Sequence, residues 1–173
     1  LAVWAWTWEY VKEHPLGGGF DVYRQNRIRY DMEQKSNPAQ PADYDAPAVR
    51  EIVDEGRAFH SSYFEMLGEQ GFPGLIIWLI IHVGGVWRME VISRIYRKRN
   101  RPDETWVAPL ARALQNAQII YLVGSLFVGI AFQPFVYMLV GMQIGLDTYL
   151  ARRRKEATSR PMRAGWLTPG QRC

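Results

Sequence analysis

The sequence predicts an all-α fragment of a polytopic membrane protein, with about three transmembrane helices and a helical loop on one side. Three observations lead to this fold class: the long apolar runs lie almost entirely after residue 71, the charge changes sign there, and basic clusters alternate with uncharged connections. Residues 1–71 hold 7 Lys+Arg and 12 Asp+Glu, a net charge of −5, whereas the rest hold 14 and 5, a net charge of +9. We therefore expect a polar loop segment (1–71), three transmembrane helices (72–150) and a basic tail (151–173).

The composition argues against several classes of protein and site. The single cysteine, Cys173, excludes an intrachain disulfide and a cysteine-based metal site, and no HExxH or paired-histidine spacing occurs. The glycine triplet at 17–19 lacks the lysine and the strand–helix context of a phosphate-binding loop. We predict neither a metal nor a cofactor. Since the chain begins at Leu1 without a signal-peptide pattern, we interpret it as the C-terminal part of a longer protein.

The polar segment is expected to be helical at both ends. At the start, Trp4, Trp8 and Val11 have helical spacing, although strict alternation of the aromatic residues fits as well. Pro15 should end any such helix, because it disfavours the helical conformation at the residue before it. We expect an irregular polar loop over 21–47, then helix from about Val49 in two pieces towards residue 71.

The second of these helical pieces carries a capping motif. Ser62 and Glu65 have the spacing of a capping box, in which each side chain bonds the backbone of the other residue. The sequence thus predicts a helix that begins at about Ser62.

The membrane segment contains three apolar stretches, at 72–87, 119–132 and 135–150. Each is shorter than the roughly 20 residues that span a bilayer, so flanking residues would have to extend it. Arginine and lysine cluster between the first and second stretches and after the third, whereas the second connection, Gln133-Pro134, is uncharged. By the positive-inside rule both clusters lie in the cytoplasm and the acidic segment lies outside. A soluble helical bundle remains an alternative, but it would not require this charge pattern.

Among the three histidines, His60 has the best position for chemistry. If Ser61 or Ser62 begins a helix, the imidazole lies at the positive end of the helix dipole, which favours its neutral form. A neutral imidazole can accept a proton as a general base. His14 precedes the proline and glycine turn, and His82 should face a neighbouring helix and bond to it.

Two motifs resemble the C-terminal part of the O-antigen ligase and polymerase-like membrane proteins. These motifs are HPLGGGF at 14–20 and FHSSYFEMLGEQGFPGL at 59–75, the second running directly into an apolar stretch. The resemblance covers about residues 1–150, and the subgroup of exosortase A-associated putative O-glycosylation ligases looks most similar. The matching residues are His14, Pro15, Leu16, Gly17, Gly19, His60, Ser61, Tyr63, Glu69 and Gly71.

The resemblance implies a bacterial inner-membrane glycosyltransferase with a periplasmic site. Such proteins transfer a glycan from an undecaprenyl-diphosphate carrier to an acceptor hydroxyl on a lipid, a protein or a growing chain, without a metal. It implies that His60 is the general base and that Arg57 binds the diphosphate, with His14 and Tyr63 as further substrate-binding residues. Further outer-loop arginines are options for the same role, namely Arg24, Arg27, Arg29 and Arg50. The fragment alone is then expected to lack most of the carrier site and to be inactive.

Two other functions stay open at this stage. A glycan polymerase of the same family would differ only in its acceptor, which these residues do not name. A non-catalytic membrane module would use Gly141 and Gly145, whose spacing suits close packing of membrane helices. In that case His60 and Arg57 would tolerate substitution.

Overall fold

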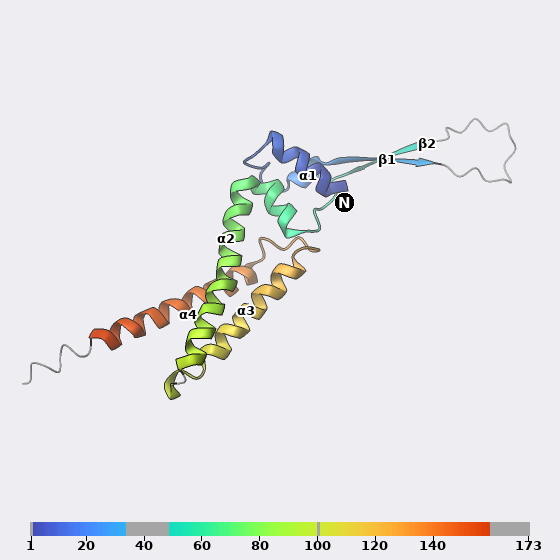
Figure 1. Ribbon diagram of the computed structural model, residues 1–173. Helices are drawn as coiled ribbons and strands as arrows, with labels where there is room; N and C mark the ends of the chain where they lie inside the picture. Colours follow the sequence, from blue (N-terminus) through green and yellow to red (C-terminus); the bar gives the residue numbers. More distant parts are fainter. Residues whose placement is uncertain (1, 34–48, 100, 160–173) are drawn as a thin grey trace, which may run out of the picture. The chain divides into compact units, whose positions relative to one another are not determined.

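The computed structural model describes residues 2–33, 49–99 and 101–159 (Figure 1). They fall into two compact units, Leu1–Leu79 with Val123–Ala131 and Ile80–Leu122 with Phe132–Cys173. In chain order the elements are α1 (Ala2–Glu13), a short 3-10 helix η1 (Val22–Gln25), strands β1 (Arg27–Glu33) and β2 (Val49–Glu55), α2 (Ser62–Arg99), η2 (Pro102–Glu104), α3 (Val107–Gly124) and α4 (Pro134–Ser159).

The N-terminal segment is a helix, which decides between the two periodicities that the sequence allowed. Val3, Thr7 and Val11 are buried at a spacing of four residues, so they form the inner stripe of α1. The Thr7 hydroxyl is satisfied within the helix because it donates to the Val3 carbonyl at 2.8 Å. The helix ends at Glu13, as expected from Pro15.

The polar loop was expected to be irregular and then helical, and for its described residues both expectations are wrong. β1 and β2 pair as an antiparallel ribbon, with Arg27 opposite Glu55 at one end and Glu33 opposite Val49 at the other. A seven-residue helix is marginal on its own, whereas the ladder satisfies the backbone groups of both segments. The chain is therefore predominantly helical with a two-stranded sheet, not all-α. The prolines of the expected loop, at 38, 41 and 47, lie outside the described residues.

The longest helix, α2, is interrupted once near its start. Gly71 has φ 66° and ψ −165°, so a first helical piece ends there and a second begins at Phe72. Pro73 is tolerated because it falls in the first turn of the second piece, where its missing N–H is not needed. Of the described helices, α2 is the one that is long and apolar enough to cross a membrane, by length and composition alone.

The other two expected spans differ from the helices observed. α3 ends at Gly124, so the stretch 119–132 is helical only in its first part. The stretch 135–150 lies within α4, which continues through the basic residues after it. The structure therefore supports one candidate membrane-spanning helix, α2, and the presence of three transmembrane helices remains a prediction.

The second unit has an apolar core with a polar layer inside it. Met89, Val107 and Leu150 are almost completely buried in the core. In the polar layer, the Gln118 amide lies 2.7 Å from Nδ1 of His82, and Gln143 donates to Gln118 at 3.3 Å. His82 therefore bonds to a neighbouring helix, as expected.

Candidate functional site

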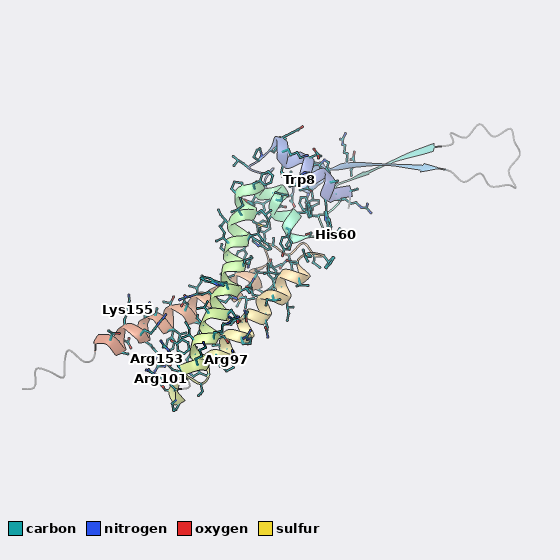
Figure 2. The ribbon with its side chains drawn as sticks, in the orientation of Figure 1. Trp8, His60, Arg97, Arg101, Arg153 and Lys155 are labelled. Atoms are coloured by element: carbon teal, nitrogen blue, oxygen red, sulfur yellow. The ribbon has the colours of Figure 1, made fainter. Side chains whose placement is uncertain are left out.

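His60 lies at the approach to α2, within the first unit (Figure 2), and Arg57 lines the same surface cavity. Both side chains are exposed, and the cavity has a volume of about 270 Å³. The cavity is closed on its other side by the start of α1, from Ala2 to Trp4. The two residues that the resemblance assigned to catalysis and to diphosphate binding thus share one cavity.

A buried asparagine holds the backbone at Arg57. The Asn26 side chain accepts a hydrogen bond from the Arg57 N–H at 2.9 Å and donates one to the Arg57 carbonyl at 2.6 Å. Its own carbonyl accepts the N–H of Gly56 at 3.1 Å. Asn26 is completely buried, although it belongs to a polar stretch next to β1. It positions the residue that carries the guanidinium.

A hydrogen bond from an indole connects Phe59, in the lining of the cavity, to α1. Nε1 of Trp4 donates to the Phe59 carbonyl at 2.8 Å, and the Trp4 ring stacks on Phe64 at 4.9 Å between centroids. His60 follows Phe59 with φ 49°, a left-handed conformation that turns the chain into α2. The sequence analysis gave Trp4 and Asn26 no role, because hydrogen bonds to the backbone of distant residues have no characteristic spacing.

The start of α2 has no capping box, contrary to expectation. The Ser62 hydroxyl donates to the Val128 carbonyl at 2.9 Å and accepts the N–H of Ile130 at 2.9 Å. The Glu65 carboxylate accepts the N–H of Ala131 at 3.0 Å. Both side chains therefore bind the backbone of the segment after α3. That segment, Val123–Ala131, belongs to the first unit.

The two sequence motifs interlock through their backbones. The N–H groups of Gly18 and Gly19 donate to the carbonyls of Gly68 and Glu69, each at 2.9 Å, and the N–H of Phe72 donates to Pro15 at 3.0 Å. These contacts lock the turn after α1 onto the break in α2.

Glycine is required on both sides of this contact. A Cβ on Gly17 would lie 2.5 Å from the Glu69 carbonyl oxygen, and a Cβ on Gly71 would collide with the Pro15 carbonyl. Both residues also have positive φ, which glycine adopts without strain. The motifs HPLGGGF and GEQGF are thus two halves of one structure.

Two carboxyl groups lie beside this lock, ahead of Gly71 and outside the apolar stretch that begins at Phe72. Burial raises the pKa of Glu69, and the N–H of Asp21, which Oε1 accepts at 3.1 Å, partly opposes the shift. Its Oε2 is buried without a hydrogen-bond partner among the described residues. Burial likewise raises the pKa of Glu65, opposed by the Ala131 N–H.

His14 and Tyr63 are not among the residues that line the cavity. The His14 ring stacks on Tyr10 at 4.4 Å between centroids, and the Tyr63 ring makes an edge contact with Trp78 at 5.1 Å.

Arg24 and Arg27, two further arginines of the outer segment, do not line the cavity either. Arg24 pairs with Asp21 at 3.4 Å and Arg27 with Glu55 at 3.2 Å. The side chains of Arg29 and Arg50 lie outside the described residues.

The cavity combines a group that can take up a proton with a cation that can hold an anionic leaving group. Within residues 2–33, 49–99 and 101–159, no cluster of histidine, cysteine and carboxylate side chains could hold a metal ion.

Residues 1–79 of the 173 match the family model described as O-antigen ligase. This match is shorter than the range 1–150 over which the motifs suggested a resemblance, and it contains His60, Arg57 and both interlocking motifs. No curated protein matches the chain, and no solved structure does. The match supports the resemblance at the level of the family, whose members are ligases or glycosyltransferase-like enzymes that act on lipid-linked glycans in a membrane context. Residues 1–79, with the cavity at the start of α2, are therefore similar to the O-antigen ligases.

Proposed function

We propose that this protein is a membrane glycosyltransferase of the ligase type, acting on the periplasmic face of the bacterial inner membrane. It would transfer a glycan from an undecaprenyl-diphosphate carrier to an acceptor hydroxyl on a lipid or a protein. The single observation that carries the proposal is that Arg57 and His60 line one cavity next to the candidate span. Within the family, we place it with the exosortase A-associated putative O-glycosylation ligases, the subgroup that its sequence resembles most.

The proposed reaction needs a base for the acceptor hydroxyl and an anion-binding group for the diphosphate that leaves. His60 takes the proton of the acceptor hydroxyl, whose oxygen attacks the anomeric carbon. The bond from that carbon to the diphosphate oxygen breaks, and the electron pair leaves with the undecaprenyl diphosphate. The Arg57 guanidinium stabilises the negative charge of this leaving group. Neither step requires a metal or a cofactor.

The orientation and the remaining site residues belong to the same proposal. Residues 1–71 lie in the periplasm and the C-terminus lies in the cytoplasm, in accord with the distribution of basic residues. His14 and Tyr63, which do not line the cavity, contact the glycan or the acceptor elsewhere.

The test is glycan transfer in a knockout strain complemented with variants of the full-length protein. His60→Ala should lower transfer by about 10²–10⁴-fold at equal membrane level, the usual contribution of general acid–base catalysis. Arg57→Lys should also be harmful, because an ammonium cannot replace the guanidinium fork. Gln25→Ala, an exposed change in η1, serves as the matched control. Wild-type transfer by His60→Ala would contradict the assignment of the base.

The same knockout strain distinguishes the ligase from two alternative functions. A ligase defect leaves long glycans on the carrier, whereas a polymerase defect leaves single repeat units. A non-catalytic packing module would tolerate changes at His60 and Arg57. That alternative is favoured by Gly141 and Gly145, which are exposed, and a Cβ on either would meet no atom of the described residues within 4 Å.

A further inference from the structure

A second cavity, of about 370 Å³, opens in the second unit between the last turns of α2 and the first turns of α3. Ser93 and Arg97 line it from α2, Thr105 from the turn before α3, and Arg112 from α3 itself. The lining therefore includes two arginines and three residues with a hydroxyl group, the third being Tyr96. Nothing in the proposed transfer reaction uses it.

The position of this cavity along α2 corresponds to the lipid headgroups. From Phe72, where the apolar stretch begins, to Ile92 the helix rises about 30 Å, which is the thickness of the hydrocarbon core. The next residues, from Ser93 to Arg97, extend about 6 Å further, into the headgroup layer. Exposed Trp106 and Tyr149 lie 5.9 Å apart between centroids and mark the same level, as interfacial aromatic residues do.

Each of the charged residues nearer to the hydrocarbon core has an ion-pair partner among the described residues. Arg88 makes two hydrogen bonds to Asp147, at 2.7 and 2.8 Å. Glu90 binds both Arg94, at 2.5 Å, and Arg112, at 2.8 Å. Intramembrane charges are normally paired in this way.

Arg97 is different from these residues. Among the described residues it has no ion-pair or hydrogen-bond partner, and its guanidinium lines the cavity. Figure 2 shows Arg97 at the same end of the helices as Arg101 and Arg153, and Arg153 is itself paired with Asp103 at 2.9 Å. Since Arg112 is committed to Glu90, Arg97 is the cation on which binding of a ligand anion would depend.

We propose that this cavity binds the phosphate of an anionic phospholipid headgroup in the inner leaflet. The planar guanidinium of Arg97 offers two parallel donors to phosphate oxygens. The hydroxyls of Ser93 and Thr105 donate to the Ala108 and Pro102 carbonyls, at 3.3 and 3.4 Å, so Arg97 supplies the donors. Basic pockets between transmembrane helices on the cytoplasmic side recognise headgroups by this chemistry. The inference rests on the membrane placement in the proposed function and does not depend on glycan transfer.

The experiment measures lipid bound to the full-length protein by native mass spectrometry. The purified protein is mixed with equal amounts of phosphatidylglycerol and phosphatidylcholine, and the ratio of the two lipids retained is determined. We expect retention of phosphatidylglycerol over phosphatidylcholine, and a loss of that preference by about tenfold in Arg97→Gln. The control is Arg152→Gln, which removes an equal, exposed charge from α4 outside the cavity and should change the ratio less than about fivefold.

Three outcomes would overturn the inference: no preference for the anionic lipid in the wild type, an equal loss in both variants, or displacement of the lipid by millimolar inorganic phosphate. The last outcome would indicate a site for soluble phosphate. Because Arg97 is exposed, its replacement should leave the circular dichroism and the melting temperature unchanged, which verifies the fold. Lost lipid binding with normal glycan transfer would refute this inference alone. Normal lipid binding without transfer in the wild type would refute only the proposed function.

Discussion

Asn26 holds the peptide groups on both sides of Arg57 with one side chain, through bonds of 2.9 and 2.6 Å. An amide is suited to this, because it carries an acceptor and a donor side by side. The guanidinium thus projects from a fixed backbone although the residue is exposed.

Replacing Asn26 by alanine should remove the hydrogen bonds that it makes to the partly buried N–H and carbonyl of Arg57. We expect a loss of about 1–3 kcal/mol in stability, and a fall in glycan transfer that exceeds the fall in protein level. Thermal unfolding in detergent and transfer in the knockout strain measure the two effects. Gln25→Ala, next to Asn26 but exposed, is the control. Equal melting temperatures for the two variants would contradict the positioning role.

The interlock between the motifs can be tested with two glycines of similar conformation. Gly17 and Gly19 have φ values of 80° and 81°, so alanine costs about the same in backbone strain at both, about 1–2 kcal/mol. Only at Gly17 does the new Cβ meet the backbone of Glu69 and Gly71, which adds about 1–3 kcal/mol. Gly17→Ala should therefore melt at a clearly lower temperature than Gly19→Ala. A Gly19→Ala variant that is equally unstable would argue against the contact.

Glu69 should give the folded protein a characteristic dependence on pH. Because burial raises its pKa in the folded state, the unfolded chain releases the proton first as the pH rises. Its contribution to stability is present below the unfolded pKa and declines as the pH rises through the folded pKa. Glu69→Gln keeps an acceptor for the Asp21 N–H and should flatten the change of melting temperature between acid and neutral pH. Glu13→Gln, an exposed change at the end of α1, should show the same change of melting temperature with pH as the wild type.

The orientation can be tested by cysteine labelling after the native Cys173 is replaced by serine. Cysteines at Gln40 should react with an impermeant reagent from outside, and cysteines at Asn100 or Ser159 only after the membrane is opened. The first two positions, and the side chain of Ser159, lie outside the described residues. Labelling of position 100 in intact cells would reverse the proposed topology.

The helix boundaries were predictable where a single residue determines them. Pro15 indicated the end of α1, and the expected helix start at Ser62 is observed because a left-handed residue precedes it. The strands were missed although β1, RIRYDME, alternates strictly between charged and apolar or aromatic residues, which is the pattern of a strand with one apolar face. The sequence of β2, VREIVDE, has no such alternation, and its place in the sheet depends on pairing with β1.

The candidate site was predictable only in part. His60 and Arg57 were identified by resemblance, and the structure places them in one cavity. The contacts around the cavity and the start of α2 join residues far apart in the chain, such as Trp4 with Phe59 and Ser62 with Val128. Side chains that bind a distant backbone leave no pattern in the sequence, so these residues could not be found from it.

The hydrogen bonds from Ser62 and Glu65 to residues 128–131 have a consequence for biosynthesis. The segment that they hold is translated after the second half of α2 and after α3. At about 5–20 residues per second, the start of α2 waits several seconds for these partners to leave the ribosome. During that interval the side chains of Ser62 and Glu65 lack these partners, so the start of α2 is held in place only after the following helices have been synthesised.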